Sequence, residues 1–88
     1  MKLILAIVRD TDNEGVSRAL TSASFGVTMI ASTGGLLRHG RTTLMIGLED
    51  DQVENALGII RANCAPPKDA GTKRATIFVV KVDQFIQF

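Results

Sequence analysis

Hydrophobic residues along the chain fall into segments that alternate between strand-like and helix-like spacing. The run Leu3–Val8 is continuously apolar, as is typical of a strand buried on both faces. In the segments 16–23 and 53–64, apolar residues recur three or four positions apart, which indicates two amphipathic helices. Shorter apolar segments at 27–32, 42–48 and 76–82 complete the pattern. The chain therefore predicts the order strand, helix, strand, strand, helix, strand.

Local signals predict where the two helices begin and end. Thr11 and Glu14 have the spacing of a capping box at the start of the first helix. Gly26 follows the last apolar position of that helix, where a left-handed residue is usually needed. Asp50-Asp51 precedes the second helix as its cap, and Pro66-Pro67 stops it.

The order of elements predicts an α+β fold, a ferredoxin-like βαββαβ sandwich, with residues 1–88 as a single domain. Two right-handed crossovers would place both helices on the same side of the sheet. The strands nevertheless carry apolar residues on both faces, since Leu3 and Leu5 point one way while Ile4 and Ala6 point the other. A bare apolar sheet exceeds the patch that a monomer exposes. We therefore expect another copy of the chain to cover the second face.

Composition limits the classes of partner. The chain has 88 residues, of which 45% are hydrophobic and 22% charged, and its formal net charge is +1. These values fit a globular domain and provide no general attraction to a nucleic acid polymer or an anionic membrane. The run Leu3–Val8 is too short for membrane insertion. The single cysteine, Cys64, allows no internal disulfide and is expected to be a buried thiol in a cytoplasmic protein.

The most informative stretch is the loop expected between the second and third strands, at residues 33–43. Its three glycines allow positive φ and a close approach of backbone amides to a ligand. Arg38, His39 and Arg41 supply cationic or donor groups, and Thr42 and two further threonines supply hydroxyls. This combination suits a phosphate or another anion, although it matches no strict phosphate-binding motif. The alternative is a flexible hairpin with solvated arginines.

Other side chains form no catalytic or metal-binding pattern. His39 is the only histidine and has no Cys or second His at ligand spacing. The acidic residues gather at helix starts, where the helix macrodipole accounts for them. We therefore expect no enzyme, no metal and no cofactor. Phe25 is expected in the core, while Phe78, Phe85 and Phe88 serve either packing or, alternatively, as a platform for a base.

Three of these stretches resemble the PII-like cyclic di-AMP receptor family. Residues 33–43, TGGLLRHGRTT, are similar to the family segment TTGGFLRxGNTT. Residues 3–10, LILAIVRD, resemble the first strand of the family, and residues 75–88, ATIFVVKVDQFIQF, resemble its closing ATVFVxxVDxFxQF. The resemblance covers nearly the whole chain, with the segments in the right order.

This resemblance implies a ferredoxin-like homotrimer similar to the nitrogen-regulatory PII proteins. Its members bind cyclic di-AMP, or a related nucleotide, in clefts between subunits and signal to a protein target that is unknown here. By motif position, the ligand-binding residues fall at Thr28, Gly35, Leu36, Leu37, Arg41, Gly47, Phe78 and Gln87. Arg38 joins this set as a cationic group of the same loop.

The chain also differs from the family pattern. Leu36 stands where the family usually has a Phe that stacks on adenine, and Arg41 stands where an Asn reads the base. Ser24 and Gly26 replace an Asn and an Arg near the end of the first helix. The long loop of the family before the last strand is reduced to residues 65–73.

Three functions are compatible with these features. The first is a ligand-sensing trimer that binds cyclic di-AMP or a related nucleotide. The second is a trimeric protein-interaction module of the same fold that has lost its nucleotide, which Leu36 and the short connection favour. The third is a small enzyme that uses Arg38, His39 and Arg41 on an anionic substrate, for which no activated base or nucleophile is found.

Overall fold

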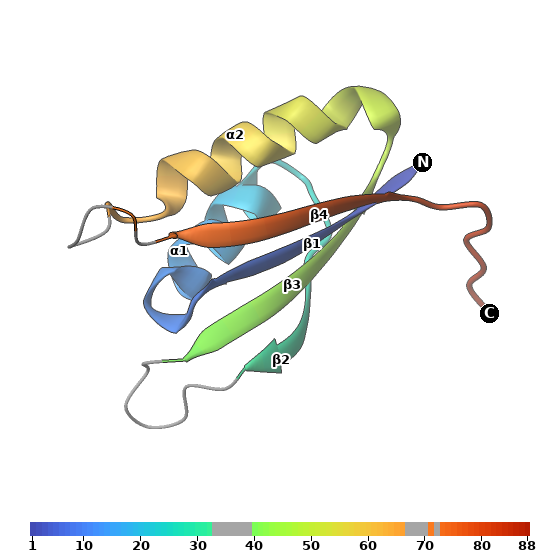
Figure 1. The fold of residues 1–88 in the computed structure, drawn as a ribbon. Helices are drawn as coiled ribbons and strands as arrows, with labels where there is room; N and C mark the ends of the chain where they lie inside the picture. The colour runs from blue at the N-terminus through green and yellow to red at the C-terminus, as the bar shows by residue number, and fades with distance from the viewer. Residues whose placement is uncertain (33–39, 67–70, 72) are drawn as a thin grey trace.

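A computed structural model describes residues 1–32, 40–66, 71 and 73–88 (Figure 1). Strand β1 (Lys2–Arg9) is followed by helix α1 (Asp10–Ser22), strand β2 (Thr28–Ser32) and strand β3 (Arg41–Leu48). The 3-10 turn η2 (Asp50–Gln52) leads into helix α2 (Val53–Asn63), and strand β4 (Ala75–Lys81) comes last. This order is the one that the hydrophobic pattern predicts, and each strand end lies within one residue of its predicted position.

The four strands form one antiparallel sheet in the order β2-β3-β1-β4. Strand β1 lies between β3 and β4, with Arg9 opposite Arg41 at one end and Lys2 opposite Leu48 at the other. Strands β2 and β4 are the two edges of the sheet. This mixed α+β arrangement is consistent with the predicted ferredoxin-like fold.

Both helices lie over one face of the sheet, which we call the inner face (Figure 1). Alternate residues of β1 and β3 point toward the helices, and those of β1 are completely buried. They pack with apolar residues from both helices, and burial of each large aliphatic side chain stabilises the fold by about 1.5–3 kcal/mol. The core from these elements comprises Ile4, Ala6, Val8, Val16, Leu20, Leu44, Ile46, Ala56 and Ile60. Phe25 and Cys64 are buried beside it, which confirms both predictions.

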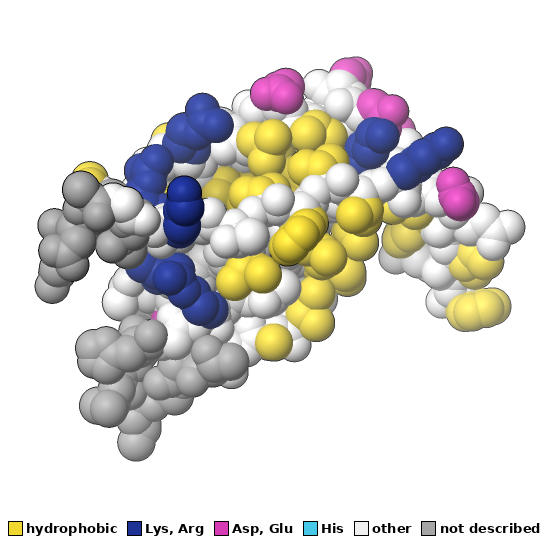
Figure 2. Space-filling model, viewed as in Figure 1, with side chains coloured by type: hydrophobic (Ala, Val, Ile, Leu, Met, Phe, Trp, Pro, Cys, Tyr) yellow, Lys and Arg dark blue, Asp and Glu magenta, His cyan; other side chains and the backbone are white. Residues whose placement is uncertain are grey.

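The opposite, outer face of the sheet is covered by no helix among the described residues. Leu5 and Met45 lie there half-buried, and Phe78 and Val80 are 53% and 40% exposed. Figure 2 shows hydrophobic side chains gathered across the middle of the visible face. The excess apolar face expected from the sequence is therefore present in the single chain.

Helix α1 begins and ends differently from the prediction. It starts at Asp10, directly after β1, and its N-cap Arg9 makes no side-chain capping bond, so the capping box predicted at Thr11 and Glu14 is wrong. The backbone N–H of Asp10 instead donates to Gly40 O at 3.1 Å. A contact with a distant part of the chain thus sets the start of this helix.

The left-handed residue that ends α1 is Ser24, with φ of 71°, and not Gly26. The Phe25 N–H donates to Leu20 O at 3.0 Å, and the Ser24 N–H donates to Thr21 O at 2.9 Å. These two bonds form a Schellman motif, in which the residue after the helix adopts the left-handed conformation. Burial of Phe25 beside Leu20 supplies the hydrophobic contact that usually accompanies it.

The second helical segment begins earlier than α2 itself, at a capping box that the sequence patterns do not predict. The Glu49 side chain accepts from the backbone of Gln52, and the Gln52 side chain accepts from the Glu49 backbone. Asp50-Asp51 therefore lies inside the 3-10 turn and not at the cap, which corrects that prediction. In the described parts of the chain, neither helix is long and apolar enough to cross a membrane.

Candidate functional site

Three of the residues predicted to bind ligand belong to the outer face. In the register of the sheet, Thr28 on β2 lies opposite Met45, Met45 opposite Leu5, and Leu5 opposite Phe78 on β4. Thr28 and Phe78 thus lie in one cross-strand row but at opposite edges. Because neighbouring strands are separated by about 4.8 Å, three spacings place them about 14 Å apart. Gly47 is exposed two residues beyond Met45, on the same face of β3.

The buried carboxylate of Asp10 joins the described residues on both sides of the loop predicted to bind anions. Ser32, at the end of β2, donates its hydroxyl to Asp10 Oδ1 at 3.3 Å. Thr42, near the start of β3, donates its hydroxyl to the same oxygen. With the bond from the Asp10 N–H to Gly40 O, one residue at the start of α1 fixes both strand ends. Asp10 is only 5% exposed and Thr42 only 1%, so the contact between these two residues is desolvated.

This contact corrects two interpretations of the sequence. The loop pattern predicts that Thr42 offers its hydroxyl to an anion, but the hydroxyl is buried and donates to Asp10. The helix macrodipole alone does not account for Asp10, because its carboxylate also accepts hydrogen bonds from two strands. The sequence does indicate that Asp10 needs polar partners, because it is an acidic residue directly after a buried strand. The neighbouring residues in the sequence do not show which side chains those partners are.

A second carboxylate, Asp12, joins the start of α1 to the end of α2. It pairs with Arg9, whose Nε donates to Asp12 Oδ2 at 2.8 Å. Its other oxygen accepts from the Ala65 N–H at 3.2 Å, and the Arg9 guanidinium also donates to Ala65 O. Asp12 is 5% exposed. Ala65, shortly after α2, is therefore anchored at the same end of the sheet as Ser32 and Gly40.

Arginines are concentrated at this end. Arg41 lies opposite Arg9 across β3 and β1, and Arg74 directly precedes Ala75, which pairs with Val8. Figure 2 shows Lys and Arg side chains gathered at the left of the visible face, at the end of the sheet where β4 begins. With a net charge of only +1 for the chain, this gathering gives one end of the molecule a local attraction for anions.

The remaining predicted residues are separated from these. Arg41 is exposed as the first residue of β3, and Gln87 is exposed in the segment after β4. Gly35, Leu36, Leu37, Arg38 and His39 lie outside the described residues. In a single chain, the described ligand-binding candidates are therefore distributed over both edges and both ends of the sheet.

Cys64 contributes a thiol near this end. Burial, followed by the negative charge of Asp12, raises the pKa of its thiol, so the thiol is less readily ionised than usual. Among the residues that the structure describes, no group of three His, Cys, Asp or Glu side chains could hold a metal ion.

Comparison with known proteins gives the family of the chain. The family model described as "Cyclic-di-AMP receptor" matches residues 1–70. The chain belongs to this family. The cyclic-di-AMP receptor family is the one that the loop and strand motifs resemble, so that prediction is confirmed.

A solved structure is similar over almost the whole length of this cyclic-di-AMP receptor family member. It is the crystal structure of a protein from Pediococcus pentosaceus ATCC 25745 that is described as functionally unknown. The two chains are 35% identical, the match covers 99% of this chain and 96% of the other, and the TM-score is 0.81. The agreement extends beyond residue 70 and thus includes β4 and the segment that follows it.

Proposed function

We propose that this protein is a signalling receptor that binds cyclic di-AMP, or a related nucleotide, in clefts between the copies of a homotrimer. Membership of the cyclic-di-AMP receptor family is the observation that carries the proposal. In this proposal the protein acts by binding, without catalytic turnover, and its nucleotide-bound form is recognised by a protein target. The binding residues are Thr28, Gly35, Leu36, Leu37, Arg38, Arg41, Gly47, Phe78 and Gln87.

The positions of Thr28 and Phe78 support a site shared between copies. They lie on opposite edge strands of the same sheet, with Met45 and Leu5 between them. A nucleotide that contacts both would have to cross the whole apolar outer face of one chain. If the edge of one copy instead approaches the opposite edge of the next, Thr28 and Phe78 meet across the boundary. Closure of three copies into a ring would also turn their outer faces toward one another.

Phe78 supports recognition of a base. Its ring is 53% exposed on the outer side of an edge strand and is therefore available for stacking. Stacking of a base on an aromatic ring contributes about 1–3 kcal/mol. In this proposal the Phe78 ring contributes the stacking that Leu36 lacks, while Arg41 holds a phosphate through its guanidinium.

Calorimetry with a panel of nucleotides tests the proposal. Cyclic di-AMP, cyclic di-GMP, ATP and ADP would be titrated separately into the protein, and we expect saturable heat with cyclic di-AMP or another member of the panel. Phe78→Ala should lower that affinity roughly tenfold, since it removes one stacking contact. Thr21→Ala on the exposed side of α1 is the matched control and should leave the affinity unchanged. Absence of heat with all four nucleotides would overturn the proposal.

Complementation tests the sharing of the site. Thr28→Arg and Phe78→Ala should each impair binding when present in every chain. When the two variants are unfolded together and refolded as mixed trimers, roughly a quarter of the clefts would combine a native Thr28 edge with a native Phe78 edge. Partial recovery of binding is therefore expected. If each variant alone and the mixture bind equally poorly, the two residues act within the same chain.

A partner experiment separates the receptor from a trimeric interaction module of the same fold. The protein would be immobilised and used to capture partners with and without the nucleotide that binds most tightly. A receptor should retain its target in a nucleotide-dependent manner. If the same partners are captured with and without nucleotide, and calorimetry gives no heat with any of the four nucleotides, a module that no longer binds a nucleotide is favoured.

A further inference from the structure

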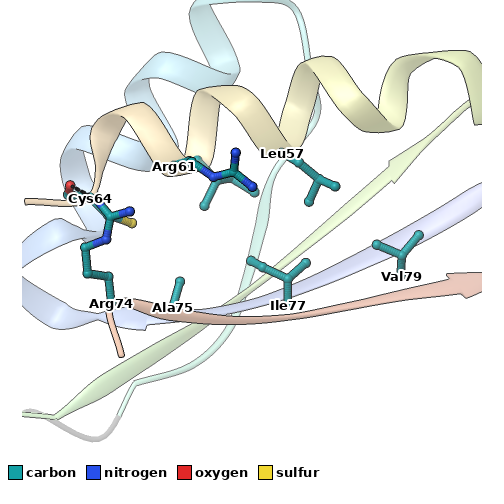
Figure 3. A pocket seen from close by; sticks show the side chains of 8 residues that line it. Leu57, Arg61, Cys64, Arg74, Ala75, Ile77 and Val79 are labelled. Carbon is teal, nitrogen blue, oxygen red and sulfur yellow. Dashed lines mark hydrogen bonds between the residues drawn. The ribbon is translucent and has the colours of Figure 1, made fainter. Parts of the chain in front are cut away.

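A groove between α2 and β4 lies on the inner side of the sheet, and none of the residues that line it is assigned to the nucleotide (Figure 3). It has a volume of about 400 Å³, which is within the range of small-molecule sites. Leu57 comes from α2, and Ile77 and Val79 come from β4. Cys64 and Arg74 lie at its other end, and Arg61 extends from α2 between them and Leu57.

The apolar half of the groove is left open by the fold. Val79 is 42% exposed even though it lies opposite Ile4 on the side of the sheet that faces the helices. Ile77 and Leu57 are only partly buried, and both lie at the border of the core. Their side chains extend toward one another across the groove in Figure 3. This surface can still bury apolar atoms, which is the main source of affinity in such sites.

The other half of the groove is cationic. Arg74 Nη1 donates to Cys64 O at 3.3 Å, which holds its guanidinium beside the end of α2. Among the described residues, neither Arg61 nor Arg74 forms an ion pair. No carboxylate of the described chain lines the groove. Two guanidinium groups that line a groove beside apolar side chains are complementary to an anionic head group on an apolar chain.

We propose that this groove binds an amphiphilic carboxylate of medium chain length. The carboxylate is held by Arg61 and Arg74, and the hydrocarbon chain lies along Ile77 and Val79 toward Leu57. A nucleotide fits this groove poorly, because its sugar hydroxyls would be placed against apolar side chains without hydrogen-bond partners. The groove and the proposed nucleotide cleft have no residue in common, and Phe78 lies on the opposite face of β4 from Ile77 and Val79.

Titration with octanoate, followed by chemical shifts of the labelled full-length protein, tests the proposal. We expect saturable shifts at Leu57, Ile77 and Val79, at least tenfold weaker binding of octan-1-ol, and no saturable binding of acetate. Equal affinity for octanoate and octan-1-ol would overturn the role of the arginines. The proposal also fails if no saturable shifts occur at these residues.

Substitutions in the groove test separately the binding of the carboxylate and of the hydrocarbon chain of octanoate. Arg61→Ala combined with Arg74→Ala should lower octanoate affinity at least tenfold, whereas Arg18→Ala, a cation on α1 outside the groove, should not. Val79→Phe keeps both arginines and fills the apolar half, so it should also lower octanoate affinity. Thermal melting identifies any variant that does not fold. If both folded groove variants bind octanoate as the unmodified protein does, the proposal is wrong.

Two further measurements separate this groove from the nucleotide cleft and from a contact between copies of the chain. Phe78→Ala should retain octanoate binding whether or not it loses nucleotide binding. Failure of the nucleotide proposal would therefore leave the groove proposal standing, and the reverse also holds. A soluble paramagnetic reagent reports whether the groove is open in the ligand-free protein, where Ile77 and Val79 should be accessible to it. Protection of these residues from that reagent would mean that a second copy of the chain occupies the groove, which would overturn the proposal.

Discussion

At the scale of single residues, Ser24 holds a backbone conformation that is unfavourable for its side chain. Its φ of 71° lies in the left-handed region, where a residue with a Cβ costs about 1 kcal/mol relative to glycine. Ser24→Gly should therefore raise the stability of the fold by about 0.5–1 kcal/mol, and thermal melting at fixed protein concentration checks it. Ser24→Ala keeps the Cβ and should give no such gain. An equal rise for both variants would contradict a penalty from the Cβ.

Asp10 has the opposite role, because its carboxylate stabilises contacts between distant segments. Asp10→Asn keeps one oxygen that can accept from Ser32 and Thr42 but removes the negative charge, so both hydrogen bonds weaken and stability should fall by about 1–3 kcal/mol. Denaturant unfolding measures the loss. Glu14→Gln on the exposed side of α1 is the matched control and should change stability by less than about 0.5 kcal/mol. Equal effects of the two substitutions would show that the Asp10 contacts contribute little.

At the scale of elements, Cys64 makes the packing of the end of α2 sensitive to alkaline pH. Burial raises the pKa of its thiol above 9.0 in the folded protein, so the unfolded chain releases the proton first. The stabilisation is therefore complete below pH 9 and is lost as pH rises through the folded pKa. Stability of the unmodified protein under reducing conditions should fall above pH 9 more steeply than that of Cys64→Ala. Parallel pH profiles would contradict this.

The sequence predicts elements well and helix ends poorly, for a physical reason. Hydrophobic periodicity depends on which residues face the core, and this is why β1 and α2 lie where the pattern places them. Helix ends depend on single hydrogen bonds. The start of α1 is set by Gly40, thirty residues away, and its end by a serine in a conformation more typical of glycine. Neither the hydrogen bond to Gly40 nor the left-handed conformation of Ser24 can be recognised from the neighbouring residues in the sequence.

For the candidate site as well, the sequence predicts some features, while others depend on how the elements pack together. Motif similarity selects Thr28, Gly47 and Phe78, and strand alternation is consistent with all three lying on one face. Alternation cannot reveal that Thr28 and Phe78 occupy opposite edges, because strand order is a property of the assembled sheet. Sequence patterns do not select Arg61 and Arg74 at all, since these residues come together only when α2 packs beside β4.

At the scale of the whole molecule, the outer face is the surface on which assembly is proposed. Val80 is 40% exposed there, opposite Leu3. Val80→Lys would place a charge on the apolar interface of the proposed trimer, where desolvation is unfavourable, while a single chain should tolerate it. Light scattering should give three times the 9.4 kDa chain mass for the unmodified protein and a lower mass for Val80→Lys. Ser22→Lys, on α1, should remain at the higher mass, and a monomeric unmodified protein would contradict the trimer.

The placement of Thr28 and Phe78 at opposite edges has a thermodynamic consequence if the site is shared. A ligand that contacts two copies at once binds only the assembled state, so its binding and the association of the chains are linked. Dilution of the protein would then weaken apparent ligand affinity, and ligand would in turn slow the exchange of subunits between trimers. The fraction of receptor that carries nucleotide would thus depend on the concentration of the nucleotide and also on the concentration of the receptor itself.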